Sequence, residues 1–208
     1  MPTQRKIPVI GILGGVASGK SAVAGLFGEL GAVVLDADRA GHRVLRQPEV
    51  EQAVRERWGD RVFDADGRVD RSGVARIVFA PPPDGPRELA WLEQLTHPRI
   101  RKLLEEEIER LTGAREVPAV VLDAPVLDKA GWDRFCDYLV FVDVPRDVRL
   151  ARALQRGWTA EQFAAREAAQ PSAAERRARA SHLVDNSGEI EQTKVQAERV
   201  WQATVADP

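Results

Sequence analysis

The 208-residue chain has a single cysteine, no excess of either charge and no long hydrophobic run. One cysteine, Cys136, excludes an internal disulfide and a cysteine-rich metal site, and we expect it to be a small core residue. The 30 basic and 32 acidic residues give a net charge of −2, so nothing indicates nucleic acid or an anionic membrane as a partner. The apolar run at 7–13 is far too short to span a bilayer. We therefore expect a cytoplasmic protein, and the sequence leaves the oligomeric state open.

Short runs of β-branched and aliphatic residues recur along the chain and predict strands that are buried on both faces. Four of them span residues 7–13, 32–38, 118–125 and 137–145, and a weaker fifth spans 182–188. Helical patterns lie between the runs. This alternation predicts a doubly wound α/β domain with a five-stranded parallel sheet.

Two longer helical segments interrupt the simple alternation of strand and helix. Residues 39–112 lie between the second and third predicted strands and contain a predicted loop, PPPDGP, at 81–86. Residues 146–180, rich in Arg, Ala and Glu, precede the fifth run. We interpret the first segment as an inserted helical subdomain and the second as a mobile helical flap or lid. The predicted core of this single P-loop chain is then about 1–38, 113–145 and 181–208.

Residues 14–21 read GGVASGKS and match the phosphate-binding P-loop pattern G-x-x-x-x-G-K-[ST] between a predicted strand and a predicted helix. The glycines let successive backbone N–H groups converge on an anion, and the positive end of the helix adds to the attraction. We expect Lys20 to reach the β- and γ-phosphates and the Ser21 hydroxyl to bind Mg²⁺. The alternative is a glycine-rich turn that binds nothing. The predicted nucleotide-binding residues of the loop are Gly14, Gly15, Val16, Ala17, Ser18, Gly19, Lys20 and Ser21.

Aspartates end the second and third predicted strands, where ligands of doubly wound sheets bind. If residues 32–38 are extended throughout, Asp36 and Asp38 point to the same side. A carboxylate there would accept a proton from a hydroxyl acceptor or orient it for in-line attack, with helix capping as the alternative. Asp123 is expected to hold Mg²⁺ through a water molecule, or else to be a turn residue.

Arginines cluster in the predicted flap. Arg152 and Arg156 are four residues apart and therefore share a helix face. Guanidinium groups stabilise the charge on a transferring phosphoryl group, and a closing flap excludes water. The alternative is a solvated charged face. The other arginines of the cluster are Arg149, Arg176, Arg177 and Arg179.

Six segments, in this order along nearly the whole chain, together resemble the dephospho-CoA kinase family. They are GILGGVASGKS, VVLDADRAGHRVL, WGDRVFDADGRVDRSGVARIVFA, THPRIR, DAPVLDKAGWD and AAQPSAAERRARASHLVDNSG. The resemblance implies ATP-dependent phosphorylation of the ribose 3′-hydroxyl of dephospho-CoA, the last step of coenzyme A biosynthesis. It also implies a nucleotide-binding core, a helical CoA-binding region and a lid.

The resemblance also implies roles for individual residues. Asp38 would face the 3′-hydroxyl, and Arg152 would be a lid arginine that reaches phosphate. His97 and Arg101 would lie in the acceptor region, and Asn186 would lie near the adenine of ATP. Three alternatives stay open: a kinase for another small molecule or a nucleoside monophosphate, a P-loop switch such as a GTPase, and a non-catalytic nucleotide-binding protein.

Several positions depart from the family pattern. Ala17 stands where the family usually has Gly, and Lys129 stands where Glu is typical, next to Asp128. Glu167 occupies a position where Ile is frequent, and Ser181 replaces the usual Asp. None of these departures changes Lys20, Ser21 or Asp38. We therefore expect the protein to retain activity, with a lid that differs in detail.

Overall fold

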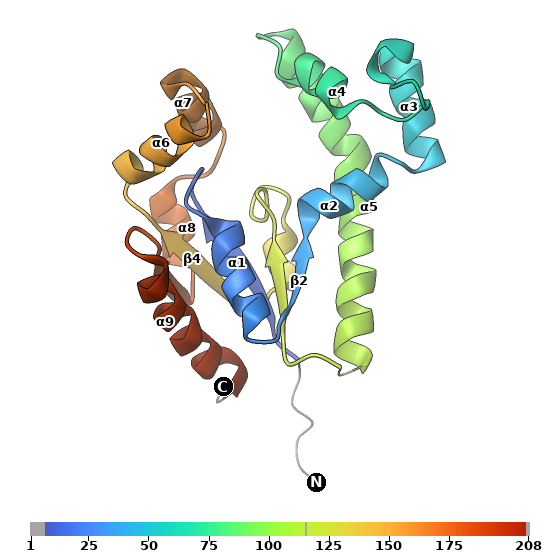
Figure 1. The fold of residues 1–208 in the computed structure, drawn as a ribbon. Helices are drawn as coiled ribbons and strands as arrows, with labels where there is room; N and C mark the ends of the chain where they lie inside the picture. The colour runs from blue at the N-terminus through green and yellow to red at the C-terminus, as the bar shows by residue number, and fades with distance from the viewer. Residues whose placement is uncertain (1–6, 115, 207–208) are drawn as a thin grey trace. The chain divides into compact units, whose positions relative to one another are not determined.

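A computed structural model describes residues 7–114 and 116–206. It contains one sheet of five parallel strands in the order β2-β3-β1-β4-β5, which confirms the predicted doubly wound α/β class (Figure 1). Four strands lie inside their predicted runs, and β1 extends one residue beyond the end of the run 7–13, to Gly14. They are β1 (Val9–Gly14), β2 (Val33–Asp36), β3 (Val120–Asp123), β4 (Tyr138–Asp143) and β5 (His182–Asp185).

Helices connect the strands, and short 3₁₀ segments at Asp60–Val62 and Trp132–Phe135 interrupt the loops. The helices of the first half of the chain are α1 (Lys20–Glu29), α2 (Ala37–Val44), α3 (Pro48–Trp58), α4 (Arg71–Val78) and α5 (Asp84–Ala114). Those of the second half are α6 (Arg146–Gln155), α7 (Ala160–Ala168), α8 (Ala173–Arg179) and α9 (Ile190–Trp201), which ends in a π-turn at Gln202–Ala206. None of the helices in the described ranges is long and apolar enough to cross a membrane.

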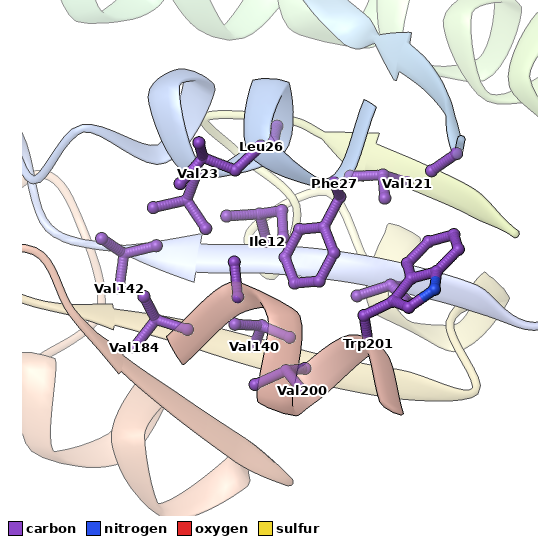
Figure 2. Packing of buried hydrophobic residues seen from close by; sticks show 14 of the residues in the cluster. Ile12, Val23, Leu26, Phe27, Val121, Val140, Val142, Val184, Val200 and Trp201 are labelled. Carbon is purple, nitrogen blue, oxygen red and sulfur yellow. The ribbon is translucent and has the colours of Figure 1, made fainter. Parts of the chain in front are cut away.

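The main core lies between one face of the sheet and the helices α1 and α9. Figure 2 shows Ile12 of β1, Val140 of β4 and Trp201 of α9 around the ring of Phe27 of α1. Ile12, Val140 and Phe27 are completely buried. Because α1 and α9 also pack on each other, this layer fixes the helix that follows the P-loop against the sheet.

A second core lies on the opposite face of the sheet. Val9 and Val120 alternate with the residues that face α1, and they pack against Leu111 near the end of α5. A sheet with apolar clusters on both faces explains why the strands read as nearly continuous apolar runs. The two clusters together pack β1 and β3 on both faces of the sheet.

Gly11 in the middle of β1 allows a close approach of the loop that precedes β4. A methyl group at this position would lie 2.6 Å from the Cys136 Sγ atom. Burial, together with the carboxylates of Asp133 and Asp137, raises the pKa of the Cys136 thiol to about 12. The thiol is therefore protonated at neutral pH. Cys136 is only partly buried and packs against the cluster of Val9, Leu111 and Val120.

The chain divides into two compact units. Unit 1 comprises Met1–Asp36 and Glu107–Pro208 and contains the whole sheet, whereas unit 2 comprises Ala37–Glu106 and is built from helices. In unit 2, buried Glu88 accepts hydrogen bonds from Arg57 at 2.9 Å and from the Trp58 indole at 2.8 Å. The division of unit 1 into a core and a flap at 146–180 stays a prediction.

The segment after β2 differs from its predicted form. The strand ends at Asp36, and α2 begins at Ala37, so Asp38 lies in the first turn of a helix and not on a strand. The expectation that Asp36 and Asp38 point to one side of an extended segment was therefore wrong. The physical reason is that Ala37, Ala40 and Val44 are all buried, and their spacing forms an apolar helix face.

The helix α5 begins earlier than expected. It starts at Asp84, within the predicted loop 81–86, and runs for 31 residues through Pro98. An aspartate in the first turn interacts favourably with the helix dipole, which offsets the turn preference of the neighbouring prolines and glycine. The segment that carries His97 and Arg101 is consequently helical.

Candidate active site

The loop between β1 and α1 adopts a tight, curled backbone. Gly14 ends β1, Lys20 begins α1, and Ser18 N donates a hydrogen bond to Gly15 O at 3.2 Å. Gly19 and Ala17 have φ angles of 87° and 60°, both in the left-handed region. Left-handed residues within a turn bring neighbouring N–H groups together on one side, which makes an anion-binding concavity.

Ala17 shows that this loop accepts a side chain where the family usually has glycine. Its φ angle of 60° costs an alanine about 1–2 kcal/mol relative to the right-handed region. Its methyl group, however, packs beside the buried cluster of Val16, Ala153 and Phe163. The contact offsets part of the backbone strain, so the loop keeps the curled form.

The first turn of α1 is suited to a bound anion. It has no side-chain cap and no acidic residue, so its N–H groups and the positive end of its dipole face no competing carboxylate in that turn. The Lys20 amine lies at the base of the loop, 3.2 Å from Gly14 O and 3.3 Å from Gly15 O. The Ser18 hydroxyl is fully buried and has no hydrogen-bond partner among the residues described. These features fit a polyphosphate.

Asn186, predicted to lie near the adenine of ATP, and Arg152, predicted to be a lid arginine that reaches phosphate, lie against the P-loop. The Asn186 amide nitrogen donates to Ser18 O at 2.8 Å, and its oxygen accepts from the Thr193 hydroxyl at 3.1 Å. The Arg152 guanidinium donates to Asn186 O at 2.8 Å and to Ser18 O at 3.5 Å. A methyl group on Gly19 would lie 2.4 Å from the Asn186 amide nitrogen, so glycine is required there by packing as well as by φ.

Two further arginines contact the P-loop, although their positions in the sequence predicted no role distinct from the rest of the cluster. Arg149 donates to Val16 O at 3.3 Å, and Arg176 donates to Gly14 O at 3.1 Å. Both are almost completely buried. From the sequence we expect the arginine cluster to contact phosphate. A sequence pattern cannot show that a guanidinium group will bind a backbone carbonyl instead, as these two do.

Carboxylates lie at the ends of two neighbouring strands. Asp123 ends β3, is buried, and is the register partner of Asp36 at the end of β2. On its other side Asp123 pairs in register with Ile12 of β1, two residues before the P-loop begins at Gly14. Within the described parts of the chain, no group of three or more His, Cys, Asp or Glu could hold a metal ion. Mg²⁺ does not need such a group, because it usually takes one or two protein ligands together with waters and phosphates.

The predicted acceptor residues lie on two helices of unit 2. Asp38 is in the first turn of α2, and His97 and Arg101 are four residues apart on one face of α5. The two helices are in contact, since a methyl group on Gly41 would lie 3.5 Å from Ile100 Cδ1. The contact falls in the part of α5 that carries His97 and Arg101. Their acceptor roles stay predictions.

A five-stranded parallel sheet with a GGVASGKS loop between β1 and α1, and arginines around that loop, defines the molecule as a P-loop kinase. The model of the dephospho-CoA kinase family matches residues 8–192. The chain belongs to this family.

Individual relatives agree with this assignment. A dephospho-CoA kinase of Symbiobacterium thermophilum is 40% identical over 198 residues, which cover 94% of this chain and 80% of the relative. A dephospho-CoA kinase of Deinococcus radiodurans is 41% identical over 183 residues, which cover 88% of this chain and 85% of the relative. A crystal structure of a Thermus thermophilus protein, 34% identical, superposes with a TM-score of 0.79 and covers 96% of this chain and 98% of that one.

Proposed function

We propose that the protein transfers the γ-phosphoryl group of ATP to the ribose 3′-hydroxyl of dephospho-CoA and releases CoA and ADP. This reaction is the last step of coenzyme A biosynthesis. The observation that carries the proposal is the curled P-loop with an uncapped α1 and Lys20 at its base, in a chain of the dephospho-CoA kinase family. A cytoplasmic location, expected from the sequence, goes with this role.

The nucleotide phosphates are bound by the P-loop. Phosphoryl transfer leaves little covalent chemistry to the protein, so positioning and charge stabilisation provide most of the catalysis. The backbone N–H groups of residues 14–21 and the first turn of α1 surround the phosphates, and Lys20 neutralises charge on the β- and γ-phosphates. We assign Mg²⁺ to Ser21 in the first turn of α1, with Asp123 at the end of β3 acting through water, because both side chains offer the hard oxygen donors that suit this ion.

Asp38 is assigned to the acceptor. It follows the end of β2 by two residues, and its side chain is exposed on the first turn of α2. An ionised carboxylate accepts a hydrogen bond from a hydroxyl group, orients its oxygen for in-line attack and takes up its proton. We assign His97 and Arg101 to binding the rest of dephospho-CoA, since α5 packs on α2 in the part that carries them.

Arg152 and Asn186 are assigned to the nucleotide side. The Arg152 guanidinium already lies beside the loop, with its nitrogen 3.9 Å from the position of a methyl group on Gly19. Its charge is therefore placed to stabilise the transferring phosphoryl group. Asn186 closes the loop from the same side through Ser18 O, and we place the adenine of ATP near it.

The substrate is tested by a coupled ADP-release assay with dephospho-CoA, adenosine and AMP as competing acceptors. We expect rapid ADP release only with dephospho-CoA. Preference for AMP or another metabolite would move the protein to a different class of small-molecule kinase. ATP binding without acceptor-dependent ADP release would support a switch or a non-catalytic nucleotide-binding protein instead.

Two substitutions test the residue roles. Lys20→Ala should abolish activity in a folded protein, because it removes the ammonium charge that contacts both the β- and the γ-phosphate. Asp38→Asn should lower kcat by about 10²–10⁴-fold with little change in ATP affinity, as expected for loss of a general base. Asp66→Asn, at an exposed aspartate of the same unit, is the control and should leave kcat unchanged. Equal turnover in Asp38→Asn and wild type would remove the role of Asp38.

A further inference from the structure

The backbone carbonyl groups of P-loop residues 14, 16 and 18 each accept a hydrogen bond from a side chain between residues 146 and 186. These side chains come from α6, α8 and the residue that follows β5. The three contacts are Arg176 Nη1 to Gly14 O at 3.1 Å, Arg149 Nη1 to Val16 O at 3.3 Å and Asn186 Nδ2 to Ser18 O at 2.8 Å. The donors therefore hold the loop through every second peptide group.

Because the peptide unit is planar, hydrogen bonds that fix the carbonyl groups also fix the direction of the N–H groups that follow them. In a planar trans peptide, the C=O of one residue and the N–H of the next point in opposite directions. Fixing the carbonyls of residues 14, 16 and 18 thus turns the N–H groups of Gly15, Ala17 and Gly19 away from the donors. A phosphate on the side of the loop opposite these donors would meet those N–H groups. Gly14 O also accepts a hydrogen bond from Lys20 Nζ at 3.2 Å.

Arg149 is held in place by contacts of its own. Its Nε donates to Val144 O at 3.1 Å, and its Nη2 donates to the Glu167 carboxylate at 2.8 Å. Burial disfavours the Glu167 carboxylate, but the hydrogen bonds and charges of Arg146 and Arg149 outweigh it and lower the pKa of Glu167. An ionised Glu167 therefore anchors Arg149 at neutral pH.

The same guanidinium group explains the glycine at position 15. A methyl group on Gly15 would lie 2.8 Å from Arg149 Nη1 and 3.0 Å from Arg149 Cζ. The φ angle of Gly15 is not in the left-handed region, so its backbone conformation does not require glycine. Arg149 is therefore the side chain that a methyl group at position 15, near the start of the phosphate-binding loop, would displace.

We propose that Arg149 and Arg176 are positioning residues for ATP binding: they hold the P-loop by its carbonyl groups and so orient its N–H groups toward the phosphates. The proposal rests on the function proposed above. Arg176 is also part of a buried ion pair with Asp128, so its removal would affect stability as well. Arg149 is the better residue for a test.

The test compares Arg149→Ala with Arg146→Ala. Arg146 pairs with the same Glu167 at 2.7 Å, but its side chain is exposed and makes no hydrogen bond to a P-loop carbonyl within residues 7–114 and 116–206, which makes it a matched control. We expect Arg149→Ala to raise the Kd for Mg-ATP, measured by calorimetry, by about tenfold or more, as for a lost charged hydrogen bond. It should raise KM for ATP by a similar factor and leave KM for dephospho-CoA unchanged. Arg146→Ala should change both constants by less than about twofold.

A double-mutant cycle with Gly15→Ala tests the contact itself. The single substitution should weaken ATP binding because its methyl group displaces the guanidinium of Arg149. In Gly15→Ala/Arg149→Ala the methyl group has room, so the double variant should bind ATP no more weakly than Arg149→Ala alone. Additive losses would show that Gly15 acts independently of Arg149, and would overturn this part of the proposal.

The outcomes separate this inference from the proposed function. If the wild-type protein binds no Mg-ATP, the proposed function fails. If the wild type binds and Arg149→Ala binds equally well, or if KM for ATP and KM for dephospho-CoA rise together, only the positioning role fails. Should Arg149→Ala not fold, Arg149→Lys replaces it: one amine cannot bridge Val144 O, Val16 O and Glu167 together, so ATP binding should still weaken selectively.

Discussion

The buried ion pair between Arg176 and Asp128 links three parts of unit 1, and Asp128→Asn is the substitution that probes it. Asp128 lies in the loop after β3. Arg176 of α8 donates a hydrogen bond to each of its two carboxylate oxygens, at 2.7 and 3.2 Å. It also donates to Gln170 at 2.8 Å and to Gly14 O at 3.1 Å. The asparagine keeps the size of the side chain and one acceptor oxygen, but removes the negative charge.

The expected loss of stability follows from burial. The side chains of Arg176 and Asp128 are only 3% and 2% exposed. Breaking a buried pair by removing one charge typically costs about 3–5 kcal/mol, because the remaining charge is buried without its partner. Since asparagine still accepts one hydrogen bond, we expect about 3 kcal/mol. For a chain of this size, that corresponds to a fall of roughly 10 °C in Tm.

The neighbouring arginine supplies a control on the same helix. Arg177 pairs with Asp143 at 2.6 Å, but these side chains are 54% and 38% exposed. Asp143→Asn should therefore change the free energy of unfolding by less than about 1 kcal/mol. Both variants are measured by urea unfolding at neutral pH. Equal effects of Asp128→Asn and Asp143→Asn would refute the argument that burial makes the first pair essential.

The pH dependence gives the prediction a second, independent check. Burial disfavours the Asp128 carboxylate, but the hydrogen bonds and charge of Arg176 outweigh it and lower its pKa below the ordinary value of 3.8. A group with a lowered pKa stabilises the fold above its ordinary pKa and loses that contribution as pH falls through the folded-state pKa. The difference in stability between wild type and Asp128→Asn should hence shrink below about pH 4. A difference that stays constant to lower pH would contradict the ion-pair explanation.

Two further predictions concern the P-loop alanine and the buried carboxylate of unit 2. Ala17→Gly should change the free energy of unfolding by less than about 1 kcal/mol. Glycine removes about 1–2 kcal/mol of backbone strain at φ 60°. It also raises the entropy of the unfolded chain and removes the contact of the methyl group, and these two effects offset the gain. Ala17→Val should cost more than about 2 kcal/mol, and thermal unfolding of the pair checks both values. Hydrogen bonds from Arg57 and Trp58 lower the pKa of Glu88 to about 2, so Glu88→Gln should cost about 2 kcal/mol at neutral pH. The difference in stability between wild type and Glu88→Gln should disappear as pH falls from 4.5 to about 2, because the Glu88 carboxylate is then protonated. A difference that stays constant over this pH range, measured by acid unfolding of both proteins, would contradict the prediction.

Local physical chemistry made much of this protein predictable from its sequence. Apolar runs ending in Asp36 and Asp123 marked two parallel strands. The second, β3, is buried along its whole length as predicted, whereas β2 is only half-buried. The GGVASGKS segment marked the phosphate loop, because its glycines and its Lys-Ser pair are a local requirement of backbone and charge. Strand order is a different matter: no local pattern says that β3 lies between β1 and β2.

The structure decided where polar side chains meet over long stretches of sequence. Arg176 reaches a carbonyl 162 residues away at Gly14, and Arg149 reaches Val16 across 133 residues. In the sequence these arginines look like the others of their cluster, and Asp128 looks like a loop residue beside an unusual lysine. Which arginine meets phosphate, which meets a carbonyl and which meets solvent depends on burial and on hydrogen-bond geometry. Burial and hydrogen-bond geometry are set only when the helices α6 and α8 pack on the rest of unit 1. For that reason the P-loop could be predicted from the sequence, whereas the residues that hold it were found only in the tertiary structure.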